Sequence, residues 1–416
     1  MWRAGYRIVL WLAFPWVLAR LWWRGRREPG YRSGIRERFG FYEDRPSRPV
    51  IWLHAVSVGE TRAVEPLVAA LQARHPECDF LLTQMTAAGR DAARQLFGDR
   101  VRLAYLAYDF PSAVRRFLRH FRPRLGVLME TEIWFNLVHE CAKSGVPVVL
   151  ANARMSEKSL RAYELVAPLA RAAFRELRAV GAQTAEDAER LRRLGAGPVE
   201  VAGNLKFDVV APAGMKELAA RFRAWFGARK VLLAASTREG EEELLLDALE
   251  RNSIGDALTV IVPRHPQRFA EVAALLETRG LRFARRSAMA TLPADCRFVL
   301  GDSMGEMAAY YGACDCAFVG GSLLPYGGQN LIEACALGVP VLVGPHTYNF
   351  SQAAETAVQS GAAVRIAGAD ELVRGARALL QDPGRRERMG RSGIAFCSAH
   401  QGATARTLAL VEKLMP

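Results

Sequence analysis

Several common catalytic signatures are missing from this 416-residue chain. It has no G-x-x-x-x-G-K-[ST] loop for nucleotide phosphates and no G-x-S-x-G turn that presents a nucleophilic serine. No G-x-G-x-x-G opens the first strand–helix unit, which disfavours a dinucleotide site. The chain also lacks an Asp-x-Asp pair, a frequent means of holding a divalent cation on a nucleotide diphosphate. We therefore expect neither a cofactor nor a metal ion.

Cysteine is scarce and unpaired in pattern. The seven cysteines are an odd number, are scattered, and several lie in apolar runs such as "ACDCAFVGG". This argues against the disulfide framework of a small secreted protein. Cys314 and Cys316 have no second Cys or His pair nearby, so a zinc site is not expected. The sequence favours a reducing compartment for the globular part.

Positive charge is abundant and concentrated near the N-terminus. The net charge is +13, and the first 50 residues hold 11 arginines against 4 acidic residues. These arginines flank the apolar run Ile8–Ala19, and five tryptophans lie in the first 23 residues. A cleaved signal peptide is disfavoured because no small-residue cleavage site follows. A helix packed on the first domain and a membrane anchor remain, and the charge favours the anchor.

The predicted anchor would place the chain on the cytoplasmic face of a membrane, because clustered arginines resist translocation. Arg24, Arg26 and Arg27 are candidate contacts for anionic groups at the membrane surface, and Arg32, Arg36 and Arg38 extend this basic collar. The run is short for a spanning helix, which needs about 20 apolar residues. Whether the segment spans the bilayer or lies in its interface stays open.

From residue 50 onward, short apolar runs alternate with amphipathic stretches. Strand–helix alternation predicts parallel sheets covered by helices on both faces. The Gly- and Pro-containing stretch 195–214 interrupts the pattern, which then restarts. We expect an α/β chain with two Rossmann-like, doubly wound domains and a cleft between them. The expected ranges are an anchor and collar (1–27), a first domain (28–210), a second domain (211–395) and a C-terminal helix (396–416) that packs back toward the first domain.

The glycine-rich segment 317–345 carries the strongest local signal for a ligand. Gly320, Gly321 and Ser322 end a predicted strand, and Gly327, Gly328 and Gln329 precede a helix expected to start near Asn330. Glycines allow close approach of a ligand, and a helix start favours phosphate. Glu333 could accept hydrogen bonds from a ribose. The alternative is an ordinary tight turn before a capped helix.

Other candidate residues follow predicted strands of the second domain. Arg264 and His265 end one strand and suit a phosphate, although solvated loop charge is an equal alternative. A helix is expected near Ser303, with Gly305 and Glu306 in its first turn and Ser303–Glu306 as a capping box. A further helix is expected to be capped by Ser236 or Thr237.

The first domain offers carboxylates and one lysine. Glu130 and Glu132 end a strand, where two close acids are costly unless solvated, paired or used. Lys206 lies in the predicted hinge. Glu60 falls in the first turn of a helix, where the helix dipole contributes about 0.3–1 kcal/mol and favours the ionised form. On this basis Glu60 would be a weak base.

Seven segments, taken in order, resemble the 3-deoxy-D-manno-octulosonic acid (Kdo) transferase family. They are "HAVSVGE", "METEIW", "GNLKFD", "ASTREGEE", "VPRHPQRF", "MGEM" and "GGSLLPYGGQNLIEACALGVPVLVGPHTYNF". The resemblance covers essentially the whole chain; Arg238 stands where many members have His. The "NLIEACALGVPV" segment is shared loosely with many GT-B glycosyltransferases, whereas the other segments are more specific.

The resemblance implies a GT-B fold and metal-independent, inverting transfer of Kdo from CMP-Kdo to lipid IVA, a lipid A precursor. It implies Glu60 as general base, with Glu130 and Lys206 supporting the transition state. CMP-Kdo would be bound by Arg264, His265, Met304, Gly305, Glu306, Asn330, Leu331, Ile332 and Glu333, and Ser322, Gly327, Gly328 and Gln329 are candidate donor-loop contacts.

Two alternatives stay open at this point. One is another GT-B enzyme that uses a UDP-sugar, either a lipid glycosyltransferase or an epimerase. The other is a non-catalytic, basic protein of a membrane surface or nucleic acid. The chain shows no aromatic-basic RNA motif, so no nucleic acid is expected as a partner.

Overall fold

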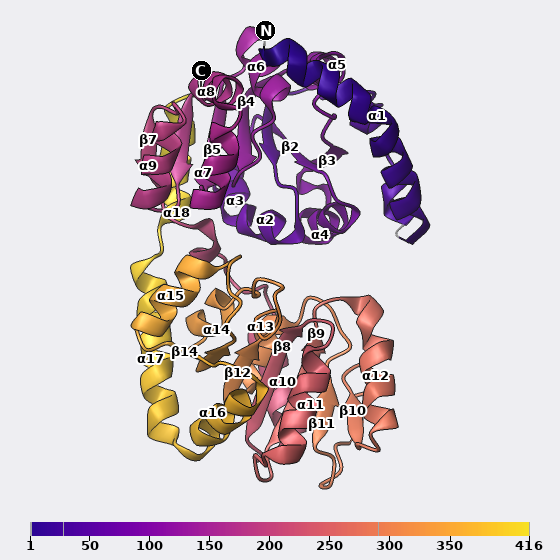
Figure 1. The fold of residues 1–416 in the computed structure, drawn as a ribbon, viewed down its shortest axis with the longest axis vertical. Coiled ribbons are helices and arrows are strands. Elements are labelled where there is room, and N and C mark those ends of the chain that lie inside the picture. The colour runs from indigo at the N-terminus through magenta and orange to yellow at the C-terminus, as the bar shows by residue number, and fades with distance from the viewer. Residues whose placement is uncertain (1, 28, 290, 416) are drawn as a thin grey trace. The chain divides into compact units, whose positions relative to one another are not determined.

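The computed structural model describes residues 2–27, 29–289 and 291–415. These residues form two compact units. Val210–Ala399 makes the second unit, and the remaining described residues on either side make the first. Each unit is an open parallel sheet with helices on both faces (Figure 1), which confirms the expected doubly wound architecture.

The first unit contains a seven-stranded sheet in the order β3-β2-β1-β4-β5-β6-β7, with every pair parallel. The chain reverses direction across the sheet between β1 and β4, where ligands bind in such folds, at the carboxyl ends of the strands. The strands are β1 (Val50–His54), β2 (Asp79–Gln84), β3 (Arg102–Tyr105), β4 (Pro123–Met129), β5 (Val148–Ala153), β6 (Ala179–Ala182) and β7 (Val199–Val201).

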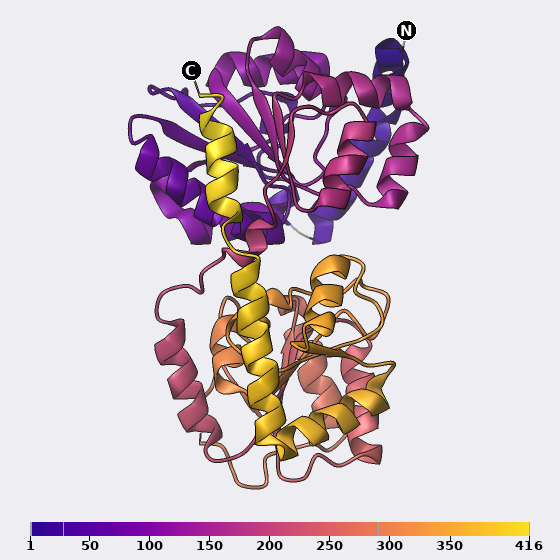
Figure 2. The same cartoon turned by 90° about the vertical axis from the view of Figure 1, so that its left-hand side faces the viewer.

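Alternation along β1 divides the core of this unit into two layers. Trp52 faces the layer covered by α5 (Pro111–Phe121), α6 (Phe135–Lys143) and α8 (Ala167–Glu176). Its neighbours Ile51 and Leu53 face the layer under α3 (Glu65–Arg74) and the returning C-terminal helix α18 (Ala403–Glu412) (Figure 2). Successive strand residues point to opposite faces, and burial on both faces explains the unbroken apolar runs.

The helices of the first unit connect successive strands, apart from α1 and α18. They are α1 (Trp2–Arg27), α2 (Val58–Ala63), α3 (Glu65–Arg74), α4 (Ala87–Phe97), α5 (Pro111–Phe121), α6 (Phe135–Lys143), α7 (Glu157–Glu164), α8 (Ala167–Glu176), α9 (Ala185–Arg193) and α18 (Ala403–Glu412), with 3₁₀ turns η1 (Pro29–Tyr31), η2 (Glu37–Phe39), η3 (Gly98–Arg100) and η4 (Leu205–Phe207).

Helix α1 packs one side against the first unit and leaves the other side exposed. The Tyr6 hydroxyl donates to Asp109 Oδ2 at 2.9 Å, and the rings of Phe14 and Phe39 lie 5.8 Å apart. All five tryptophans of the helix are largely exposed. The segment Trp2–Trp23 is long and apolar enough to cross a membrane by length and composition.

The second unit repeats the design with the order β10-β11-β9-β8-β12-β13-β14. Its strands are β8 (Val231–Thr237), β9 (Leu258–Pro263), β10 (Phe283–Arg285), β11 (Phe298–Leu300), β12 (Cys316–Val319), β13 (Val341–Val343) and β14 (Ala363–Arg365). Its helices are α10 (Met215–Phe226), α11 (Glu241–Arg251), η5 (Pro266–Arg268), α12 (Phe269–Thr278), α13 (Met307–Ala313), α14 (Ile332–Ala336), α15 (Ser351–Gln359), α16 (Ala369–Gln381) and α17 (Pro383–Ala399).

Two helix starts differ from the sequence prediction. Helix α13 begins at Met307, after Gly305, whose φ of 82° is left-handed; Gly305 and Glu306 therefore precede the helix and no capping box forms. Helix α11 begins at Glu241 after the left-handed Gly240, so neither Ser236 nor Thr237 caps it. Left-handed residues end the preceding turn and delay each helix.

Candidate active site

Glu60 lies at the carboxyl edge of the first sheet, on the short helix α2 that follows β1 (Figure 1). Ser57 caps this helix and its Oγ accepts from the Glu60 amide at 3.3 Å. The Glu60 carboxylate in turn accepts from the Val56 amide at 2.8 Å and from Ser57 Oγ at 2.9 Å. The predicted first-turn position is confirmed, and the reciprocal bonds hold the carboxylate in one orientation.

The environment of Glu60 makes it a stronger base than its helix position suggests. Burial, and after it the charge of Glu130, raise the pKa of Glu60 from 4.5 to about 7 against the hydrogen bonds from Val56 and Ser57, which lower it. Desolvation disfavours the charged form and here outweighs the hydrogen bonds that favour it. The expectation of a weak base was therefore wrong. A carboxyl group with this pKa can accept a proton near neutral pH.

Glu130 and Lys206 form an ion pair at the same edge. Lys206 Nζ lies 2.9 Å from Glu130 Oε1. Glu130 follows β4 with a left-handed φ of 56°, a strained conformation for a residue with a side chain. Asn152 Oδ1 accepts from the Leu205 amide at 3.0 Å, which fixes the η4 turn that carries Lys206. The structure thus brings together residues from β1–α2, β4 and η4.

Glu132 is the third carboxylate of this group. Trp134 Nε1 donates to Glu132 Oε2 at 2.8 Å, and burial raises the pKa of Glu132. The group therefore holds three carboxylates, of which Glu130 is paired with Lys206 and the other two, Glu60 and Glu132, have raised pKa values. Such a cluster of perturbed acids at a strand edge is a candidate functional site.

In the second unit, Arg264 and His265 follow β9. Arg264 Nε donates to Gln329 Oε1 at 3.2 Å, which joins the β9 loop to the glycine-rich loop. Burial and then Arg264, Arg238 and Arg268 lower the pKa of His265. Arg268 is bound to the buried Glu242 at 2.6 Å and has a structural partner. Arg264 therefore supplies a positive charge at the end of β9, beside a His265 whose lowered pKa favours the neutral imidazole, and the guanidinium suits a phosphate.

In the segment 304–306, the backbone at Gly305 is accessible, whereas the carboxylate of Glu306 already has a hydrogen-bonding partner. Met304 is 50% exposed, and a Cβ added at Gly305 would meet no atom within 4 Å. Glu306 accepts from Arg286 Nε and Nη2 at 3.0 and 2.7 Å. The segment is therefore open at Gly305, and Arg286 holds Glu306.

The residues around α14 fall into two groups, one with partly exposed polar side chains and one with buried apolar side chains. Asn330 Oδ1 accepts from the Ile332 amide at 3.1 Å, and Asn330 Nδ2 donates to Glu333 Oε1 at 3.0 Å. Leu331 and Ile332 are buried, so only their backbone groups can face a ligand. This leaves Asn330 and Glu333 as the side chains that can present polar atoms.

The loop before α14 is held by its own hydrogen bonds. Ser322 is fully buried; its hydroxyl donates to Val319 O and accepts from the Gly344 amide. The left-handed Gly327 and Gly328 shape the loop, and the Gly328 amide donates to Gly321 O at 2.6 Å. Ser322 therefore positions the loop and does not present a polar group to a ligand.

The basic collar after the anchor is only partly exposed. Arg26 lies over the Trp22 ring at 3.9 Å and is exposed, whereas the side chains of Arg24 and Arg27 lie outside the described part of the structure. Arg38 is only 1% exposed, and its guanidinium stacks on Tyr105 at 3.9 Å. The assignment of Arg38 to headgroup contacts was therefore wrong, because Arg38 belongs to the core.

Comparison with known proteins decides the family. A family model described as 3-deoxy-D-manno-octulosonic-acid transferase (kdotransferase) matches residues 33–209. A 3-deoxy-D-manno-octulosonic acid transferase from Bordetella pertussis is 44% identical, covering 99% of each chain. The chain belongs to the Kdo transferase family. The Haemophilus influenzae member is 34% identical over 99% of this transferase and 98% of its own length.

Structural likeness places the transferase in the GT-B glycosyltransferase fold. A glycosyltransferases group 1 model matches residues 245–396. A Rickettsia africae glycosyltransferase covers 89% of this chain and 99% of its own at TM-score 0.60 and 11% identity. A Neisseria meningitidis UDP-GlcNAc 2-epimerase covers 88% and 99% at TM-score 0.59 and 16% identity. At these identities the likeness shows the fold alone, and the full-length relatives identify a Kdo glycosyltransferase of lipopolysaccharide biosynthesis.

One positioning residue escaped the sequence prediction. Glu241 is fully buried and accepts from the amides of Arg238, Gly321 and Leu323 at 2.8, 2.6 and 2.9 Å. It therefore ties the start of α11 to the glycine-rich loop. Its place in the "ASTREGEE" segment was the available signal, but two of its three partners, Gly321 and Leu323, lie about 80 residues away in the chain.

Proposed function

We propose that this transferase moves Kdo from CMP-Kdo to lipid IVA with inversion, using Glu60 as general base and no metal ion. The observation that carries the proposal is the partly buried Glu60 carboxylate, held by Val56 and Ser57, with a pKa raised to about 7. An acceptor hydroxyl becomes a competent nucleophile only when a base takes its proton.

The proposed step balances as a single displacement. The acceptor oxygen forms a bond to the anomeric carbon of Kdo while the bond from that carbon to the CMP phosphate oxygen breaks. The hydroxyl proton passes to the Glu60 carboxylate, and the bonding electron pair leaves with CMP. Inversion needs one base on the face opposite the leaving group and no covalent partner.

Positive groups of the chain can offset the charge of the donor. In the second unit, Arg264 lies beside Gln329, and Asn330, which is bonded to Glu333 in the first turn of α14, lies just before that helix. Preorganised cations and amides stabilise a phosphate that gains charge as it leaves. In the first unit, the Lys206 ammonium beside Glu130 supports the transition state.

Membrane association is part of the proposal. We place the transferase at the cytoplasmic face of the inner membrane, with α1 as the anchor. The support is the apolar helix with its exposed tryptophans, since amphipathic aromatic side chains favour a membrane interface.

The experiment is incubation of the purified transferase with lipid IVA and CMP-Kdo, followed by mass spectrometry of the lipid. We expect one or more Kdo additions, unchanged in excess chelator. A UDP-sugar in place of CMP-Kdo should give no addition. Loss of transfer in chelator that magnesium restores would contradict the metal-free mechanism, and absence of any addition to lipid IVA would contradict the acceptor.

A further inference from the structure

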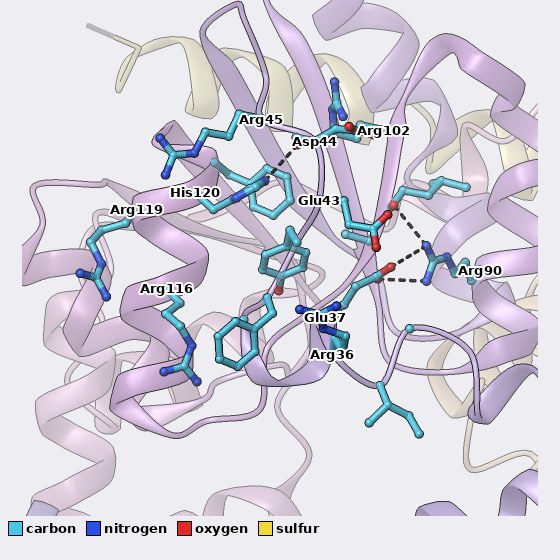
Figure 3. A pocket seen from close by; sticks show the side chains of 18 of the residues that line it. Arg36, Glu37, Glu43, Asp44, Arg45, Arg90, Arg102, Arg116, Arg119 and His120 are labelled. Atoms are coloured by element: carbon cyan, nitrogen blue, oxygen red, sulfur yellow. Dashed lines mark hydrogen bonds and ion pairs between the residues drawn. The ribbon is translucent and has the colours of Figure 1, made fainter.

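A groove of about 850 Å³ lies at the edge strand β3 of the first unit (Figure 3), and Glu60 is not among the residues that line it. Its walls come from η2 and the loop after it, from α4, from the edge strand β3 and from α5. Seven arginines and three acidic residues line it, a net charge of +4. None of these residues belongs to the candidate active site.

Hydrogen bonds fix the groove walls. Glu37 binds Arg90 at 3.0 and 3.1 Å and accepts from the Tyr105 amide at 2.6 Å. The Tyr42 hydroxyl donates to the Tyr105 carbonyl at 3.0 Å. These side chains satisfy outward backbone groups of Tyr105 on β3, which would otherwise be available for pairing with another strand. The groove is therefore a preformed surface, and its edge is not available for strand addition.

Several arginines that line the groove have no hydrogen-bonding or charged partner in the part of the chain that the structure describes. Within the described residues, the side chains of Arg36, Arg45 and Arg102 make no hydrogen bond or ion pair. Figure 3 shows Arg45 and Arg102 on one side of the groove and Arg116 on another. Arg116 donates Nε to the Phe39 carbonyl at 2.9 Å and stays partly exposed. Planar guanidinium groups from separate walls suit phosphate oxygens.

The rim combines this charge with exposed apolar side chains. Ile35 is 40% and Phe41 is 50% exposed, and the Arg116 guanidinium lies 4.4 Å from the centre of the Phe41 ring. Exposed apolar groups next to arginines are typical of surfaces that bind anionic membranes. A soluble phosphate ligand would gain nothing from the exposed apolar pair.

The groove also adjoins the anchor helix. Phe39, in the η2 turn that lines the groove wall through Glu37, packs on Phe14 of α1. The outer side of α1 carries the exposed Trp11 and Trp16. Apolar anchoring and headgroup binding would therefore come from connected parts of one unit.

We propose that this groove binds the phosphate headgroup of an anionic membrane lipid, with Arg36, Arg45 and Arg102 as ligands and Phe41 entering the interface. The proposal rests on the membrane association proposed above and adds a defined headgroup site to it. It does not depend on the transfer chemistry, because binding to vesicles needs neither CMP-Kdo nor an acceptor.

The test is partitioning of the full chain onto two kinds of vesicle. One is phosphatidylcholine alone, and the other also contains about 30 mol% phosphatidylglycerol, an anionic fraction that gives a clear surface potential. Helix α1 should bind both, so the readout is the ratio of the two partition coefficients. We expect the variant Arg36→Gln/Arg45→Gln/Arg102→Gln to lower this ratio about tenfold or more, from the contribution of each basic residue near an anionic surface.

The matched control is Arg221→Gln/Arg374→Gln/Arg377→Gln, which removes three exposed arginines from the second unit. An equal fall of the partition ratio in both variants would show that only net charge matters and would overturn the proposed headgroup site. Unchanged partitioning of the groove variant would overturn it too. Phe41→Ser should weaken binding to both vesicle types, and near-ultraviolet circular dichroism checks that each variant is folded.

A soluble-ligand arm separates the two sources of phosphate. We expect inorganic phosphate, titrated by calorimetry, to show no binding that depends on the groove arginines. Groove-dependent binding of phosphate with no groove dependence on vesicles would overturn the lipid assignment. If vesicle binding follows the prediction while lipid IVA is not modified, the transfer proposal fails and the groove proposal stands.

Discussion

The pH dependence of transfer tests the environment of Glu60. The pKa of Glu60 rises from 4.5 to about 7, chiefly through burial and then through Glu130. A rise of this size corresponds to about 3 kcal/mol of preference for the protonated carboxyl group. Because the base acts in its ionised form, kcat/KM should fall about tenfold for each unit of pH below about 7.

Changing the neighbours of Glu60 should shift the pH at which kcat/KM falls on the acid side of the profile, called the acid limb below. Glu130→Gln removes the negative charge and leaves the Lys206 ammonium, so the pKa of Glu60 and the acid limb should both move to lower pH. Glu132→Gln should move the limb less, because Glu132 is the weakest of the causes that raise the pKa. Glu65→Gln is the control and should leave the limb in place. A limb that stays at about 7 in Glu130→Gln, or moves upward, would refute the reasoning.

The same shift has a consequence for stability. A carboxyl group whose pKa is raised on folding contributes stability that is fully present below about 4.5 and is lost as pH rises through about 7. Glu60→Gln removes this dependence. The stability of this variant relative to the parent chain should therefore be higher at about pH 8 than at about pH 5, because the carboxyl group of the parent ionises between these two values. The measurement is the difference in Tm at the two pH values.

Three further predictions concern other residues of the two units. Lys206→Met should lower transfer about a hundredfold with donor affinity retained, as expected for a group that acts on the transition state; equal loss of donor binding in calorimetry would argue against that role. Glu241→Gln leaves backbone amides of the glycine-rich loop without an acceptor, which costs about 1–3 kcal/mol, so CMP affinity should weaken. Gly344→Ala places a Cβ 2.2 Å from the Ser322 carbonyl oxygen, and overpacking of this kind costs about 1–3 kcal/mol; Gly368→Ala, which meets no atom within 4 Å, should leave Tm unchanged.

The strands were predictable because a buried parallel strand is apolar on both faces. The runs containing Trp52 and Phe318 became β1 and β12. The edge strands β7 and β10 lack such an apolar run, since each has only three residues and is partly exposed. Helix starts at Met307 and Glu241 were placed too early, because left-handed Gly305 and Gly240 are not visible in an apolar pattern.

The candidate residues were found by motif, but their chemistry depends on tertiary contacts. The hydrogen bonds and burial of Glu60 combine a local turn with a distant carboxylate, Glu130. The burial of Arg38 follows from packing on Tyr105, which is 67 positions away in the chain. Periodicity describes neighbours in sequence, whereas both effects arise from neighbours in space.

The groove arginines illustrate the same point. Arg36 and Arg45 lie in the basic N-terminal region that the sequence marked, but Arg102 comes from β3. Only the parallel sheet, with η2 against its edge strand, brings them to one surface.

The most direct test of the account is the single-turnover rate of Kdo transfer by Glu60→Gln, with CMP-Kdo bound at saturation. Glutamine keeps the size of the side chain and can still accept from the Val56 amide, but it cannot take the hydroxyl proton. The account predicts a rate lower by about 10²–10⁴, the usual contribution of a general base, with donor affinity unchanged. A rate within about tenfold of the parent chain, below that contribution, would contradict Glu60 as the base.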